Sequence, residues 1–180
     1  MRRAKGTISV FTFKEGILAR AAHDLALHTQ RFDIALDGEQ VTATLPLAAL
    51  VVIGPVEGGV IRAELYDAGR RAEVEQAMHS EVLHTARNPT ARFDGRAVAR
   101  GAGFVVTGRL SLAGQNAPLA FDVIEDSVGD GGHGYRARCE RQPSRWGIAP
   151  YKATLVAIRL KDVIRIELAL TEETTTHSAA

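Results

Sequence analysis

GFVVTGRLSLAGQNAPLAFDV, residues 103–123, is the stretch that decides the fold. In each half of it, apolar side chains of one parity alternate with more polar ones. Successive side chains of a β-strand point to opposite faces, so each half predicts a strand with one apolar face. The short segment between the halves contains Gly114, Asn116 and Pro118, which favour turns. We therefore expect an antiparallel hairpin whose apolar face carries Phe104, Val106, Leu110, Leu112, Leu119, Phe121 and Val123.

The same alternation recurs along most of the chain. It predicts further strands at residues 7–13, 17–27, 32–36, 41–47, 91–99, 135–139 and 153–170. Asp37-Gly38 is a strong tight-turn dipeptide, and short turns between strands favour antiparallel pairing. Residues 50–59 and 127–134 are rich in glycine and predict loops, and the polar residues from about 171 predict a disordered tail.

One segment has the period of a helix instead. Val74, Met78 and Val82 recur every fourth position, which gives an apolar stripe on one side. Asp67, just before this segment, can accept a hydrogen bond from a free backbone N–H group at a helix N-terminus. The pattern predicts one amphipathic α-helix over about residues 68–83, which lies on the sheet or covers an open end of it.

The order of these elements determines the fold class. Amphipathic strands with one helix and no βαβ alternation predict a mainly β protein, either an antiparallel sandwich or a closed barrel. At 180 residues the chain is expected to form a single domain, residues 1–180. A barrel of about eight strands can be filled by its own side chains or leave room for one small apolar ligand. Periodicity does not choose between these two interiors.

Composition excludes several classes of partner. The formal net charge is +1 without a basic block, so nucleic-acid binding is not expected. No window is long and apolar enough to cross a membrane. Polar residues interrupt the apolar core that a signal peptide would need after Arg2 and Arg3, so we expect a cytoplasmic protein. Cys139 is the single cysteine, which excludes an intrachain disulfide. We interpret it as a small, partly buried side chain rather than as a reactive thiol.

Five stretches together point to a family. They are residues 23–32, residues 41–50, MHSEVL with NPTARF in residues 78–93, GRLSLAGQNAPL in residues 108–119, and Trp146-Gly-Ile148 with Lys161-Asp-Val163. In this order they resemble the YceI-like family of lipocalin-like barrels, over most of residues 7–170. The resemblance implies an extended antiparallel β-barrel that holds a long apolar molecule. The chain departs from the family at Ile8-Ser-Val-Phe11, where relatives have another opening motif, and it shows no leader of the kind that exports many relatives.

The histidines give no metal or catalytic signature. His23 and His28 are five residues apart, so in a strand they face opposite sides. His79 and His84 also lack the spacing that brings metal ligands together, and no Gly-x-Ser-x-Gly motif accompanies the serines. We therefore predict no metal site, no catalytic residue and no cofactor other than a bound isoprenoid or fatty acid, in a protein that is not an enzyme.

Two polar-tipped side chains allow two interpretations each. His23 falls on an apolar face, either as a core histidine with one polar partner or as a handle for a ligand head group with Arg20 or Tyr151. Trp146 is either a core plug or part of a cavity wall. With the helix around Met78 as a lid, the predicted ligand-binding residues are Phe11, His23, Phe104, Leu110, Leu112, Phe121, Trp146, Ile148, Tyr151 and Ile166.

The function that the resemblance implies is binding or carriage of a long apolar ligand: a polyisoprenoid, an isoprenoid quinone or a fatty acyl lipid. The alternatives are a filled-core barrel that acts as a protein-interaction or stress-response module and, less favoured, a small hydrolase. Replacing Gly108 by leucine is expected to abolish ligand binding in a hollow barrel and mainly to destabilise a filled one. An exposed apolar lip could also pair two subunits in a homodimer.

Overall fold

The computed structural model describes residues 1–15, 23–128, 132–153 and 158–173. In this part of the chain, twelve strands form one antiparallel sheet. The strands are β1 (Arg2–Glu15), β2 (Asp24–Thr29), β3 (Asp33–Asp37), β4 (Gln40–Pro46), β5 (Val51–Glu57), β6 (Val60–Ile61), β7 (Thr90–Arg100), β8 (Gly103–Leu112), β9 (Gln115–Val128), β10 (Gly132–Arg141), β11 (Lys152–Ala153) and β12 (Ile158–Glu172). The helical segments are η2 (Leu47–Ala49), η3 (Ala63–Leu65), α1 (Ala68–Ala77), η4 (Met78–Val82) and η6 (Pro143–Trp146).

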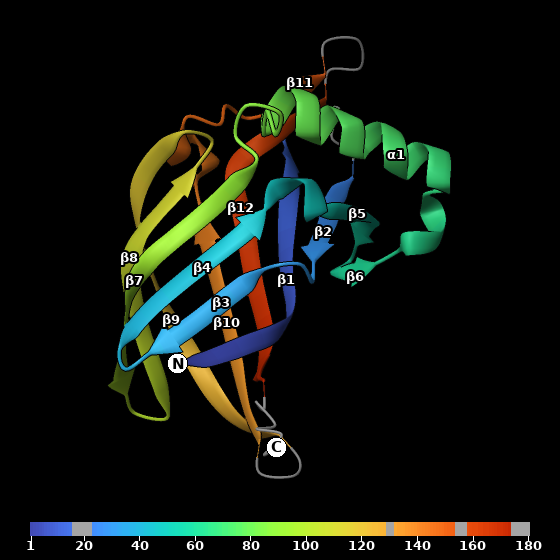
Figure 1. Cartoon of the computed structure of the whole chain (residues 1–180). Coiled ribbons are helices and arrows are strands. Elements are labelled where there is room, and N and C mark those ends of the chain that lie inside the picture. Colours follow the sequence, from blue (N-terminus) through green and yellow to red (C-terminus); the bar gives the residue numbers. More distant parts are fainter. Residues whose placement is uncertain (16–22, 129–131, 154–157, 174–180) are drawn as a thin grey trace, which may run out of the picture.

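Eight of the strands close into a barrel (Figure 1). The ring runs β1–β3–β4–β7–β8–β9–β10–β12 and returns to β1 through an antiparallel ladder between β1 and β12. Closure leaves no free edge around the ring, which is how an antiparallel sheet of this length avoids edge-to-edge association. The predicted mainly β, lipocalin-like barrel with one helix is therefore confirmed.

The wall of the barrel is extended at one end. Strand β1 pairs with β3 through Arg2–Ala4 and with β2 through Ile8–Thr12. Strand β2 then pairs with β5, and β5 pairs with β6. Helix α1 lies across this same end of the barrel, whereas the start of β1 and the end of β12 lie toward the other (Figure 1).

The helix forms where its sequence pattern predicts it. The Asp67 carboxylate accepts a hydrogen bond from the Arg70 backbone N–H at 2.7 Å and so caps the N-terminus. The last turn widens, and the Leu83 N–H donates to the carbonyl of Met78 at 2.9 Å. The apolar stripe faces the barrel, where Val74 and Met78 pack with Leu27, Leu50 and Val52. No helix among the described residues is long and apolar enough to span a membrane.

The predicted hairpin is present, with a shorter turn than expected. Leu112 pairs with Gln115, so the connection is Ala113-Gly114 alone, and both residues have positive φ (51° and 76°). Two-residue connections of this kind match the twist of the paired strands. Asn116 and Pro118, which we assigned to the turn, therefore belong to β9.

The prediction of a loop at residues 50–59 is wrong, because Val51–Glu57 form strand β5. Gly54 and Pro55 suggested a loop, but they sit where the β2–β5 register shifts between Ala26 and Leu27. A bulge of this kind accommodates residues that a regular ladder would exclude. Pro55 cannot donate a ladder hydrogen bond, yet its carbonyl accepts one from the Arg62 N–H at 2.8 Å.

Three other boundaries differ from the predictions. The loop predicted at 127–134 is shorter, since β9 continues to Val128 and β10 begins at Gly132. Thr171 and Glu172, which we placed in the tail, still belong to β12 and pair with β1. Parts of the expected strands 17–27 and 153–170, namely residues 17–22 and 154–157, lie outside the described residues, as does the tail from 174.

Candidate functional site

The barrel encloses a cavity of about 910 Å³. Inward side chains of the ring strands and the stripe of α1 line it, including Ile8, Leu36, Met78, Phe93 and Leu168. The lining also includes all seven residues that we predicted for the apolar face of the hairpin. The interior is therefore hollow, which the periodicity of the strands left open.

Nine of the ten predicted site residues come together around this cavity. They come from segments more than 100 residues apart in the sequence, and the barrel closure places them on one surface. These nine are His23, Phe104, Leu110, Leu112, Phe121, Trp146, Ile148, Tyr151 and Ile166.

Phe11 is the exception, and its assignment to the wall is wrong. Its neighbours Val10 and Thr12 line the cavity, so the alternation of β1 turns Phe11 to the outer face. There the Arg165 guanidinium lies over the ring, 4.3 Å from its centre. This cation–π contact helps to bury an aromatic ring on the outer surface. The sequence does not reveal the contact, because Arg165 comes from β12.

Sequence reasoning missed several residues of the wall. Thr12, Tyr66, Tyr135 and Cys139 all line the cavity. Tyr135 and Cys139 have the same parity in β10, so the alternation of this strand could have identified them. The Thr12 hydroxyl oxygen is buried and makes no hydrogen bond within the described residues.

The cavity opens beneath the start of the helix. Leu65, Arg70 and Glu73 line the cavity and are also exposed, and among the described residues no other lining residue is exposed. Tyr66, next to Leu65 in the chain, and His23, whose ring contacts Tyr66, also line the cavity. We call these five residues the mouth. The Arg70 guanidinium donates to the Glu73 carboxylate at 3.0 Å, and this hydrogen bond raises the pKa of Arg70.

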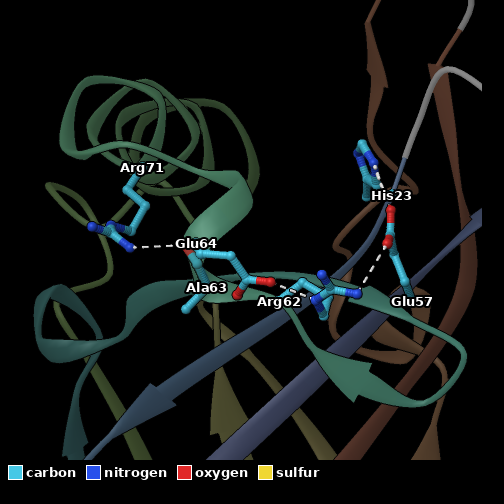
Figure 2. A network of polar contacts seen from close by, with 6 residues as sticks. All are labelled: His23, Glu57, Arg62, Ala63, Glu64 and Arg71. Atoms are coloured by element: carbon cyan, nitrogen blue, oxygen red, sulfur yellow. Dashed lines mark hydrogen bonds and ion pairs between the residues drawn. The ribbon is translucent and has the colours of Figure 1, made fainter.

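Polar contacts connect the mouth to the extension of the wall (Figure 2). The His23 imidazole lies 3.6 Å from the Glu57 carboxylate and edge-on to the Tyr66 ring at 6.2 Å. The Glu57 carboxylate also lies 3.9 Å from the Arg62 guanidinium, which binds Glu64 at 2.5 Å. His23 thus has a polar partner and lines the cavity, but its side chain is 35% exposed and is not a core residue. Its use as a handle for a ligand head group stays a prediction.

Aromatic rings also line the cavity away from the mouth. Phe104 and Tyr135 pack with ring centres 6.3 Å apart. The Tyr135 hydroxyl donates to the Glu172 carboxylate at 3.3 Å, and Arg2 lies 3.6 Å from the same carboxylate. Burial, followed by the nearby Glu172 charge, raises the pKa of Tyr135, so the phenol remains neutral.

With this geometry described, the chain can be compared with known proteins. The YceI-like domain matches residues 6–171, which is nearly the whole chain. The chain belongs to the YceI-like family. This confirms the resemblance seen in the sequence. No curated protein matches the chain in sequence.

Solved structures share the YceI-like fold at low sequence identity. A polyisoprenoid-binding domain from Saccharophagus degradans, implicated in plant cell wall breakdown, superposes with a TM-score of 0.65 at 9% identity, and the match covers 96% of this chain and 97% of that one. BcnA from Burkholderia cenocepacia has a TM-score of 0.60 at 14% identity, with 95% and 96% covered. A Campylobacter jejuni YceI protein has a TM-score of 0.57 at 13% identity, with 82% and 84% covered.

In this YceI-like barrel, Trp146 is both a plug and a wall. Only 2% of the residue is exposed, and its ring lines the cavity from η6. The indole N–H donates to the carbonyl of Leu110 at 2.8 Å, which satisfies its single donor. Trp146 therefore links η6 to β8, the first strand of the predicted hairpin.

Two serine hydroxyls of the YceI-like barrel have hydrogen-bond partners other than histidine. Ser80 donates to the carbonyl of Gln76, and Ser144 donates to the carboxylate of Asp162. Burial raises the pKa of the Cys139 thiol, which disfavours the reactive thiolate. Within the described residues, no hydrogen bond joins a histidine ring to a serine hydroxyl or to Cys139, and no group of three or more potential ligands could hold a metal ion.

Proposed function

We propose that this chain is a non-enzymatic binding or carrier protein that holds one long apolar ligand inside its barrel. The observation that carries this proposal is a cavity of about 910 Å³ walled by inward aliphatic and aromatic side chains. Pockets for small ligands span about 300–1,000 Å³ and combine apolar walls with few polar groups. Burial of the ligand's apolar surface would drive binding, at about 25 cal/mol per Å².

An isoprenoid or a fatty acyl chain suits this wall best. The described wall is mostly aliphatic, and the charged side chains that reach it are few. The Thr12 hydroxyl lacks a partner within the described residues and could meet one oxygen of a ligand. The solved polyisoprenoid-binding domain with the same fold makes a polyisoprenoid, including a quinone with such a tail, the first candidate. We propose no catalytic residue and no further cofactor.

Native mass spectrometry of the purified protein, followed by lipid extraction, tests this proposal. We expect an added mass that organic solvent removes and that identifies an isoprenoid or acyl lipid. The stripped protein should bind the same lipid again at one molecule per barrel. Preparations from several hosts that carry no added mass, together with failure of the protein to bind any such lipid, would overturn the proposal.

A pair of variants links the binding to the cavity. Ala97 in β7 and Ala137 in β10 are buried and line the cavity from strands three positions apart in the ring. The double variant Ala97→Leu with Ala137→Leu should narrow the cavity and weaken binding by about tenfold or more, because added side-chain volume replaces ligand volume. Ala120→Leu, on the exposed outer face of β9, adds a similar side chain without reaching the cavity and should bind normally.

A further inference from the structure

Exposed apolar side chains gather beside the mouth of the cavity. Val60 is 60% exposed, Ile61 38% and Leu65 47%, and all three lie within six residues of the chain on β6 and η3. Large apolar side chains in water carry an unfavourable hydration cost, so a cluster of them on an ordered segment indicates a binding surface. We call Val60, Ile61 and Leu65 the rim patch.

Hydrogen bonds hold the rim patch in place. The Arg62 N–H donates to the carbonyl of Pro55 at 2.8 Å, and the Arg71 guanidinium donates to the carbonyl of Ala63 at 3.3 Å (Figure 2). The Glu57 carboxylate lies between His23 and Arg62, so it connects the segment to the edge of the barrel. The polar side chains of this segment thus contact one another or the barrel, and the apolar side chains are left facing solvent.

The rim patch is continuous with the interior of the barrel. Leu65 is exposed and also lines the cavity. An apolar ligand that leaves the cavity at the mouth would therefore meet the rim patch before it met open water. Because exposing a long apolar chain to water is costly, the apolar phase that receives the ligand must contact the protein at this place.

The charge around the rim patch indicates which surface fits it. Residues 57–75 contain five acidic and three basic side chains, a net charge of −2. Arg62 and Arg70 are already paired with Glu64 and Glu73. A surface with a net negative charge is not attracted to anionic lipids. It therefore favours membrane binding by insertion of apolar side chains into neutral lipid.

We propose that the rim patch inserts into a bilayer of zwitterionic lipid, so that ligand passes between the membrane and the cavity at the mouth. The proposal rests on the carrier function proposed above. A second copy of the chain fits the rim patch less well. A stable interface uses roughly 20–30 residues of each partner, and the rim patch has three side chains. A second copy would also cover the mouth rather than receive the ligand.

The test uses vesicles of phosphatidylcholine and a matched pair of double variants. Val60→Ser with Ile61→Ser removes two side chains of the rim patch but leaves Leu65, which lines the cavity. The control, Val98→Ser with Ile124→Ser, removes the same two residue types, 48% and 59% exposed, from the outer wall. These two lie on β7 and β9 near the turn that joins β7 to β8, at the barrel end away from α1 (Figure 1).

We expect co-flotation of the wild type and the control with the vesicles, and a loss of partitioning of about tenfold or more for the rim variant. Raising the salt concentration should leave the partitioning of the wild type nearly unchanged. Equal partitioning of the rim variant and the control would overturn the proposal. Binding that needs anionic lipid and disappears at high salt would also overturn it. So would a wild-type protein that does not bind vesicles and sediments as a dimer, if the rim variant sediments as a monomer and the control variant does not.

Transfer of a pyrene-labelled fatty acid separates this inference from the carrier function. In solution without vesicles, the rim variant should bind the labelled fatty acid like the wild type, and its transfer to vesicles should be slower by about tenfold. Normal binding with unchanged transfer would overturn the docking surface alone. Absence of binding of the labelled fatty acid and of a polyisoprenoid in every form, with vesicle binding retained, would overturn the carrier function and leave the docking surface in place.

Discussion

The wall formed by β7, β8 and β9 and the rim formed by β5, β6, η3 and α1 follow different rules. In the wall, each strand pairs with the next one along the chain, and inward and outward residues alternate regularly along β8 and, after the turn at Ala113-Gly114, along β9. In the rim, Glu57 contacts His23, and Val52 packs against Met78, so the segments that meet are separated in sequence. A side chain's environment can be inferred from local pattern only where its neighbours are also local.

The wall should be broken most severely at Gly108. A Cβ atom there would lie 2.3 Å from the carbonyl oxygen of Asp94 and 2.6 Å from both the Cα of Gly95 and the Phe93 ring. Gly108→Leu should therefore prevent folding or lower the free energy of unfolding by more than about 4 kcal/mol, as measured by urea denaturation. The loss would reflect backbone crowding, so this variant cannot report on ligand binding as the sequence had suggested.

Gly38→Ala is the control for the wall. Gly38 has φ +60° in an exposed turn, and no atom lies within 4 Å of the position of its missing Cβ. Gly38→Ala should therefore lower the free energy of unfolding only through the left-handed backbone conformation, by about 1–2 kcal/mol. Similar losses of stability at Gly38 and Gly108 would show that packing in the wall is looser than the contacts of Gly108 indicate.

Trp146 tests how strongly η6 is bound to the wall. Trp146→Ala removes a buried ring and should cost about 3–5 kcal/mol of unfolding free energy. Trp146→Phe keeps an aromatic ring but loses the hydrogen bond to the Leu110 carbonyl, which should lower the free energy of unfolding by about 1–2 kcal/mol. If the two variants lost the same stability in urea, the hydrogen bond rather than the packing would dominate.

Cys139, on β10 next to the wall, reports whether the lining of the cavity contacts ligand. Because burial raises its thiol pKa, alkylation by iodoacetamide should be slow at pH 8 and accelerate as the pH rises above 9. Bound lipid should slow the reaction further, by about tenfold, since Cys139 lines the cavity. Ala120→Cys in a Cys139→Ser background, on the exposed outer face, should react quickly with or without lipid. Equal rates at Cys139 in stripped and loaded protein would place the ligand elsewhere.

The smallest effect is expected at His23, which precedes β2 and contacts the rim through Glu57. His23 and Glu57 are 35% and 47% exposed, so their contact is screened by solvent. His23→Ala should cost less than about 1 kcal/mol in thermal unfolding and leave lipid binding within a fewfold of the wild type. A loss as large as that of Trp146→Ala would show that the rim depends on this pair as strongly as the wall depends on its core.

The sequence predicted the parts that repeat locally. The alternation of Phe104, Val106 and Leu110 identified one face of the cavity, and the capping residue Asp67 identified the start of the helix. It failed at Gly54 and Pro55, which usually break strands, because a bulge opposite β2 accommodates them. It also failed at Phe11, because an arginine from β12 covers the outer face of that ring.

The sequence by itself determined that this chain is built of antiparallel amphipathic strands with one covering helix, and it revealed the family. Strand period and turn chemistry are short-range properties that consecutive residues specify. Only the tertiary structure decided that the strands close around empty volume and that the opening lies beneath Leu65 and Arg70. Both depend on the ladder between β1 and β12, whose partners lie at opposite ends of the chain. No local pattern can specify how much space remains when such distant segments close a ring.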